Sequence, residues 1–169
     1  MDSTLKIRPF GPEDTVEVTE LLHRAYGELA ALGLNFTAAD QDPATTARRA
    51  SAGASWVLLL QGRITATSTI SLPPEIGLRK LTAEARTPGR AWLNQLAVDP
   101  DHRGQGLARL LREESFRWAR RSGATSVGLD TAQPADHLVR LYTGWGFLHR
   151  TVIQWPGKTY RSVVMTRPL

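Results

Sequence analysis

The stretch LAVDPDHRGQGLARLL, residues 96–111, contains the change from a strand pattern to a helix pattern that decides the fold. Its apolar run stops at Asp99-Pro100, Gly104 and Gly106 follow one residue apart, and a leucine-rich helical pattern then begins. The first N–H groups of a helix have no partner within it, and the helix dipole adds partial positive charge there. Since glycine lets those amides approach a ligand without a Cβ in the way, the stretch predicts a pyrophosphate-binding turn.

Two common phosphate motifs do not fit this turn. A nucleoside-triphosphate loop requires GxxxxGK[ST], and the sequence contains no such string. The dinucleotide fingerprint requires GxGxxG, but Arg109 stands where its third small residue belongs.

The pattern that fits is R-x-x-G-x-A, formed by Arg103, Gly106 and Ala108. Together with the segment LYTGWGF, residues 141–147, it resembles the GNAT superfamily of acyl-CoA-dependent N-acyltransferases. The order of expected elements resembles the family over nearly the whole chain, most weakly before residue 55. The resemblance implies an enzyme that uses acetyl-CoA as co-substrate to acetylate an amine.

Hydrophobic periodicity predicts an α/β fold (α+β), a single domain over residues 1–169. The mixed central sheet is expected to have about seven strands, flanked by about four helices. Strands are expected at 5–10, in a hairpin at 55–72, and at 90–98, 125–132, 147–155 and 160–168. Helices are expected at 11–29, 43–51, 107–122 and 134–146. Residues 73–89 are expected to form a long polar link that is mobile and closes over the substrate.

The resemblance also implies where acetyl-CoA binds. The strand before the glycine turn is expected to splay from the strand that carries Asp130, and the pantetheine arm would pair with its free edge. Backbone groups of Leu96, Ala97 and Val98 are the expected partners of that arm. The pyrophosphate would lie on Arg103, Gly104, Gln105, Gly106, Leu107, Ala108 and Arg109.

Four further residues are candidates for the chemistry and the acceptor. Tyr142 is the expected acid that protonates the leaving thiolate, although ring packing would also explain it. Asp130 is the candidate base or water-orienting residue, although it would also suit the turn after its strand. Trp92 and Asn94 are expected at the acceptor site, where strand packing explains Trp92 equally well. Glu75 and Glu84 lie in the polar link and would suit a cationic acceptor.

Composition limits the other classes of protein. The sequence has no cysteine, which excludes a thiol-linked acyl-enzyme, and its four histidines lack the spacing of metal ligands, so no metal is expected. The net charge of +5 favours anionic partners such as phosphorylated cofactors, but no basic run indicates nucleic-acid binding. With no apolar run long enough for a membrane span and no signal-peptide pattern, a cytoplasmic protein is expected. A homodimer through an exposed sheet edge is an open alternative.

Three questions stay open at the level of sequence. The acceptor is either a small-molecule amine or the amine of a protein N-terminus or lysine, and the lack of a substrate-recruiting module favours the small molecule. A non-catalytic acyl-CoA-binding protein would keep the same motifs without turnover. Many family members carry asparagine where this chain has Ala135, so Asp136 or His137 would have to supply that contact to the cofactor arm.

Overall fold

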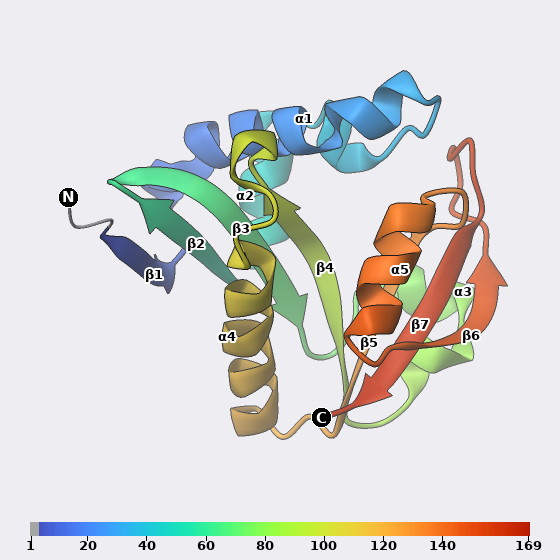
Figure 1. The fold of residues 1–169 in the computed structure, drawn as a ribbon. Helices are drawn as coiled ribbons and strands as arrows, with labels where there is room; N and C mark the ends of the chain where they lie inside the picture. Colours follow the sequence, from blue (N-terminus) through green and yellow to red (C-terminus); the bar gives the residue numbers. More distant parts are fainter. Residues whose placement is uncertain (1–3) are drawn as a thin grey trace.

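Seven strands form one mixed sheet in the order β1-β2-β3-β4-β5-β7-β6, as the computed structural model of residues 4–169 shows (Figure 1). All neighbouring strands are antiparallel except β4 and β5, which run parallel. The sheet confirms the predicted fold class. The strands are β1 Leu5–Pro9, β2 Ala54–Leu60, β3 Arg63–Ser71, β4 Arg90–Val98, β5 Ser126–Ala132, β6 Leu148–Ile153 and β7 Ser162–Pro168.

Five α-helices cover the two faces of this sheet, one more than the sequence predicted. They are α1 Thr15–Ala31, α2 Pro43–Ser51, α3 Ile76–Leu81, α4 Leu107–Arg121 and α5 Asp136–Gly144. Helices α4 and α5 share one core cluster, in which Phe116 and Phe147 pack with their ring centroids 6.2 Å apart. Helices α1 and α3 pack on the opposite face, through Leu21 on Ala97 and through Leu78 on Trp92, and α2 packs against α1.

The polar link of residues 73–89 is ordered, so the prediction of an unstructured loop is wrong. Helix α3 and a 3₁₀ turn, η3 Ala83–Arg86, occupy most of it. Leu78 and Ala85 are each 1% exposed and pack in the same cluster as Trp92. Because α3 has only six residues, it is too short to show a sustained helical period, but these apolar side chains anchor the segment to the sheet.

Strands β4 and β5 are paired over only three residues each, Arg90–Trp92 with Ser126–Gly128. Beyond Trp92 and Gly128, β4 pairs only with β3, and β5 pairs only with β7. In Figure 1 the two strands diverge upward from this paired end. The sheet therefore opens between β4 and β5, which is where the family resemblance implied a splay.

A β-bulge in β4 determines which side chains face the opening. Thr69 pairs with Gln95 and Ile70 pairs with Leu93, so Asn94 is the extra residue. A bulge of this kind shifts the alternation of side chains by one position. It allows Trp92 and Ala97 both to pack on the face of α1 and α3, although five positions separate them.

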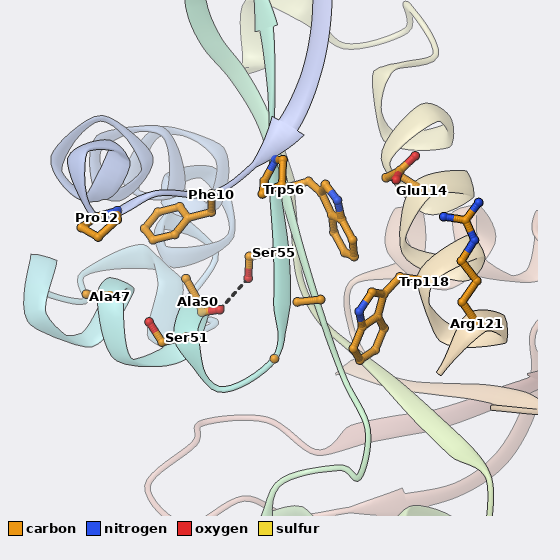
Figure 2. A pocket seen from close by; sticks show the side chains of 13 residues that line it. Phe10, Pro12, Ala47, Ala50, Ser51, Ser55, Trp56, Glu114, Trp118 and Arg121 are labelled. Carbon is orange, nitrogen blue, oxygen red and sulfur yellow. Dashed lines mark hydrogen bonds between the residues drawn. The ribbon is translucent and has the colours of Figure 1, made fainter. Parts of the chain in front are cut away.

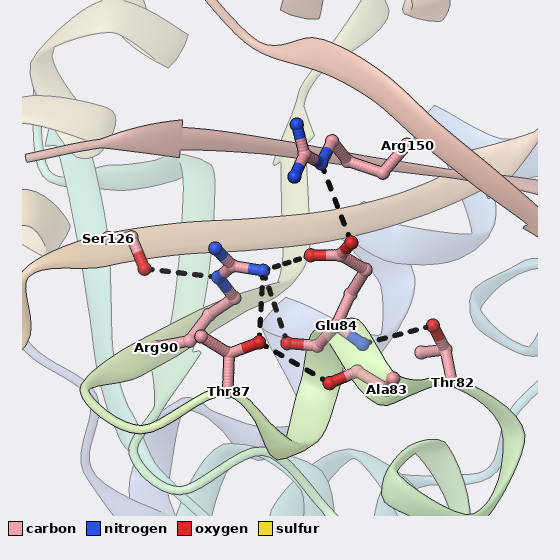
Figure 3. Close-up of polar contacts among 7 residues, drawn as sticks. All are labelled: Thr82, Ala83, Glu84, Thr87, Arg90, Ser126 and Arg150. Carbon is pink, nitrogen blue, oxygen red and sulfur yellow. Dashed lines mark hydrogen bonds and ion pairs between the residues drawn. The ribbon is translucent and has the colours of Figure 1, made fainter.

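A cluster of polar contacts holds the paired end of β4 and β5 together (Figure 3). The Glu84 carboxylate in η3 accepts hydrogen bonds from Arg90 and, at 3.5 Å, from Arg150 of β6. Nε of Arg90 donates to Ser126 Oγ at 3.0 Å, across the β4–β5 pair. The sheet is thus held together at the bottom of the opening by polar side chains from four elements, three of them charged.

No helix among residues 4–169 combines the length and the apolar character needed to cross a bilayer.

Candidate functional site

A cavity of about 560 Å³ occupies the opening between β4 and β5. Its lining comes from both faces of the sheet: Tyr26 of α1, Arg49 of α2 and Trp155 of the β6–β7 loop on one side, and Tyr142 of α5 on the other. The cavity therefore passes through the sheet, and a molecule entering from one face meets groups presented from the other.

Asp130 lies in this cavity and is held by two tryptophans. Oδ1 accepts a hydrogen bond from Nε1 of Trp92 at 2.9 Å, and Oδ2 accepts one from Nε1 of Trp155 at 2.8 Å. Burial raises the pKa of the Asp130 carboxyl above its ordinary value, while the two indole donors and Arg49 oppose that rise. Because each oxygen keeps a second lone pair, the carboxylate is oriented and still able to accept a proton.

Tyr142 places its hydroxyl in the same cavity. Its ring packs edge-on against Trp145 and Phe147, with centroid distances of 5.7 and 6.2 Å. Among residues 4–169 the hydroxyl has no hydrogen-bond partner, so the ring is fixed by packing and the hydroxyl has no structural bond to keep. Burial, reinforced by Tyr26 and Asp130, raises the pKa of Tyr142 well above its ordinary value, so the phenol stays protonated.

The free edge of β4 faces the cavity with unpaired backbone groups. Asp99 N–H donates to Thr65 of β3 at 2.8 Å, and since backbone groups alternate along a strand, Ala97 also faces β3. Leu96 and Val98 therefore face the opening. The Leu96 carbonyl accepts a hydrogen bond from the Tyr26 hydroxyl of α1 at 3.0 Å, so this backbone oxygen already has a partner.

The glycine turn ends in an exposed helix N-terminus. Gly104 and Gly106 adopt φ of 76° and 79°, and Gly106 is the N-cap of α4. A Cβ at either glycine would meet nothing within 4 Å, so the turn requires glycine for its backbone conformation and leaves open space around it. Leu110 N–H is the first to bond back, to Gly106 O, and the amides from Gly104 to Arg109 have no acceptor within residues 4–169. These free amides and the space beside them fit a pyrophosphate.

The two arginines of the turn have protein partners. Arg103 donates to Glu28 at 2.8 Å and to the Ala25 carbonyl at 3.1 Å, so its side chain fastens the turn to α1. Arg109 pairs with Glu113 one helical turn later at 3.0 Å. Since both guanidinium groups have protein partners, the groups of this turn that are left to face an anion are its backbone amides.

The other candidate residues fall into two groups. Asn94, Trp92 and Glu75 line the cavity; Asn94 is exposed and donates to Ser71 Oγ at 3.0 Å, whereas Trp92 is 1% exposed. Glu84 is not a lining residue, because it belongs to the charged cluster of Figure 3. Ala135 is 2% exposed and packs in an apolar cluster at the start of α5, so this position holds a core side chain.

Sequence reasoning missed Trp155 and the pair Arg48 and Arg49. Trp155 lies just after β6, and no local pattern indicates that its indole bonds to Asp130, 25 positions earlier in the chain. Arg48 and Arg49 lie in the last turn of a short polar helix, and no local pattern marks them as cavity residues. No group of three or more residues suited to a metal ion occurs within residues 4–169.

A second cavity, of about 550 Å³, lies between α2, the start of β2 and α4 (Figure 2). Phe10, Trp56 and Trp118 give it apolar walls, and the rings of Trp56 and Trp118 lie 6.5 Å apart in a T shape. Its charged lining residues, Glu114 and Arg121, lie on α4 (Figure 2). It contains none of the candidate residues for cofactor binding or catalysis.

The fold and this site define a family. Residues 16–147 match the model of the Acetyltransferase (GNAT) family, so the chain belongs to the GNAT acetyltransferases and is an acyltransferase. It is 30% identical to S-(2-succino)cysteine N-acetyltransferase of Bacillus subtilis over 160 residues, 92% of this chain and 91% of that protein. It is also 39% identical to rat N-acetyltransferase 8B over 71 residues, 42% of this chain, and spans about a third (32%) of that relative's length.

Solved structures share the fold at low sequence identity. The ribosomal-protein-S18-alanine N-acetyltransferase of Escherichia coli superposes with a TM-score of 0.72 at 19% identity, over 98% of this chain and 94% of that one. A Salmonella typhimurium protein assigned as an acetyltransferase was solved with its cofactor acetyl-CoA. It superposes with a TM-score of 0.72 at 20% identity, over 99% of this chain and 95% of that one.

Replacing Ala108 by glutamate is expected to weaken acetyl-CoA binding roughly 10- to 100-fold, because a carboxylate would then lie beside the pyrophosphate. Calorimetric titration measures the change. Ala44→Glu is the matched control, since Ala44 holds the equivalent second position of α2. Equal affinity in the two variants would contradict a phosphate site at this turn.

Proposed function

We propose that the protein transfers the acetyl group of acetyl-CoA to the primary amine of a small molecule, by direct attack within a ternary complex. The observation that supports this most strongly is the cavity through the sheet, in which Tyr142 and Asp130 meet beside the free edge of β4. A group able to give a proton and a group able to take one then share a single space.

The cofactor is proposed to enter along this free edge. Backbone groups of Leu96 and Val98, which flank the β3-facing Ala97, would bind the pantetheine arm as an added strand, and an N–H near Leu96 would polarise the thioester carbonyl. The pyrophosphate would lie on the amides from Arg103 to Arg109. When bound, acetyl-CoA supplies a thioester carbon that the amine attacks as the bond to sulfur breaks. Because the chain has no cysteine, no thiol-linked acyl-enzyme is available.

Two protons must move for the reaction to complete. An amine with the pKa of lysine is almost wholly charged near neutral pH, and making it neutral costs about 4.6 kcal/mol. Asp130, directly or through water, takes the proton that the ammonium loses to become the attacking amine. Tyr142 gives its hydroxyl proton to the departing thiolate, which leaves as the free thiol, and the second proton that the nitrogen loses after attack restores the phenol.

The acceptor is proposed to be a small molecule bound among α2, α3 and the β6–β7 loop. The cavity volume of about 560 Å³ lies within the range common for small-molecule sites. Trp92 and Asn94 line it, and the Nε1 of Trp92 donates a hydrogen bond to Asp130. The B. subtilis relative, named for the acetylation of S-(2-succino)cysteine, supports the same class.

Amine-dependent release of CoA tests the function, and Tyr142→Phe tests its acid. The variant is expected to lower kcat by about 10²- to 10³-fold with little change in KM, because the leaving thiolate loses its proton donor. Tyr160→Phe is the matched control, since Tyr160 also lines the cavity and burial raises the pKa of Tyr160 to about 12. Undiminished turnover in Tyr142→Phe would remove it as the acid. Binding of acetyl-CoA without CoA release for any small amine or peptide would contradict catalysis itself.

Asp130→Asn tests the base through pH dependence. Since burial raises the pKa of Asp130, kcat/KM of the native enzyme should rise with pH through a midpoint above the ordinary aspartate value of about 3.9. In Asp130→Asn this rise of kcat/KM with pH should disappear, and the rate should fall by about 10²-fold or more. The second rise at higher pH, which comes from ionisation of the amine itself, should remain. A slower variant with an unchanged profile would show that Asp130 orients groups and is not the base.

A further inference from the structure

We propose that Arg49, assisted by Arg48, binds a carboxylate of the acceptor, so that the acceptors are amines of amino-acid type that carry a negative charge. This inference rests on the proposed function, since it assigns the substrate class of the same cavity. It concerns the wall formed by α2, to which neither the sequence motifs nor the catalytic candidates extend.

The last turn of α2 brings two guanidinium groups to the cavity. Arg48 and Arg49 both line it, and Arg49 is half-buried. Within residues 4–169, neither has a carboxylate within ion-pair distance. Within the same residues, the Arg49 side chain makes one hydrogen bond, and it is to a neutral group, from Nη1 to Gln41 Oε1 at 2.9 Å. Since guanidinium carries several N–H donors in a planar fork, most of the Arg49 donors remain free.

The contact to Gln41 positions Arg49 without neutralising it. Gln41 is 5% exposed, and its Nε2 donates to Thr46 Oγ1 at 2.8 Å. Thr46 Oγ1 in turn accepts from Thr19 Oγ1 of α1 at 2.7 Å. This buried chain of neutral groups fixes the guanidinium against α1 and α2. A half-buried cation so placed lacks the anionic partner that normally offsets the loss of water.

Charged side chains of both signs line the cavity. Arg48 and Arg49 stand on the α2 wall, and Lys158, whose Nζ donates to the Asn35 carbonyl at 2.7 Å, stands on the β6–β7 loop. Two carboxylates also line the cavity, Asp130 at the opening of the sheet and Glu75 before α3, and both lie near enough to Arg49 to act on it electrostatically without forming an ion pair within residues 4–169. An acceptor with its amine at Asp130 and a carboxylate at Arg49 would match both ends.

These arginines are separate from the phosphate-binding turn. None of the residues from Arg103 to Arg109 lines the cavity that contains Arg49. The cofactor phosphates are assigned to that turn, at the N-terminus of α4, whereas Arg48 and Arg49 lie at the C-terminal end of α2. The anion that suits Arg49 therefore belongs to the acceptor.

Binding measurements on the intact protein saturated with CoA test the assignment. The probes are the common L-amino acids and S-(2-succino)-L-cysteine, each titrated beside the analogue in which every carboxylate is a carboxamide. The best-binding acid should bind at least about tenfold more tightly than its amide, as expected for a charge-assisted hydrogen bond. Arg49→Gln should remove this preference, and Arg49→Lys should keep part of it. Arg63→Gln, which removes the same charge from the exposed first residue of β3, should leave it unchanged.

Two results would overturn the inference: binding of the amides as tight as that of the acids, or no binding of any probe in either form. Melting temperatures of the three variants exclude a folding defect. CoA release measured with acetyl-CoA and the same probes separates the inference from the proposed function. Turnover without a preference for acids would contradict the carboxylate site alone, whereas an Arg49-dependent preference in binding without turnover would contradict catalysis alone.

Discussion

The short ladder between β4 and β5 is the constraint on which the site depends. It contains three residue pairs and ends where Trp92 lies beside Gly128. A Cβ at position 128 would lie 2.3 Å from Cζ3 of Trp92, so glycine is the residue that lets the indole cover β5 at this point. The indole N–H then reaches Asp130, two residues further along β5 and on the same face. One tryptophan thus closes the ladder and orients the carboxylate at the opening.

The two faces of the sheet contribute different groups to the site. Helices α4 and α5 bring the glycine turn and Tyr142, while α1, α2, α3 and the β6–β7 loop enclose the other side. Under the proposed function, a cofactor and an acceptor would approach from opposite faces and meet between the strands. Backbone amides are suited to the cofactor, which is the same in every reaction, and side chains of α2 and the β6–β7 loop are suited to distinguishing acceptors.

The amino-acid sequence predicted the parts that local patterns encode. The strand, glycine turn and helix over residues 96–111 have local signals, and Tyr142 lies in a recognisable motif. Contacts between distant residues were not predictable, because no local signal marks Trp155 as a partner of Asp130 or Arg49 as a cavity residue. Helix α3 escaped prediction for a related reason, since Leu78 in α3 and Ala85 in η3 fix this segment to a core that forms only in the folded chain.

Hydrogen–deuterium exchange at single backbone amides is the most direct test of the central claim that the opened edge of β4 binds the pantetheine arm. With acetyl-CoA added, the amides of Leu96 and Val98 should become protected, whereas Ala97, which faces β3, should be protected with or without it. Unchanged fast exchange at Leu96 and Val98 in protein saturated with acetyl-CoA would show that the cofactor does not pair with this edge.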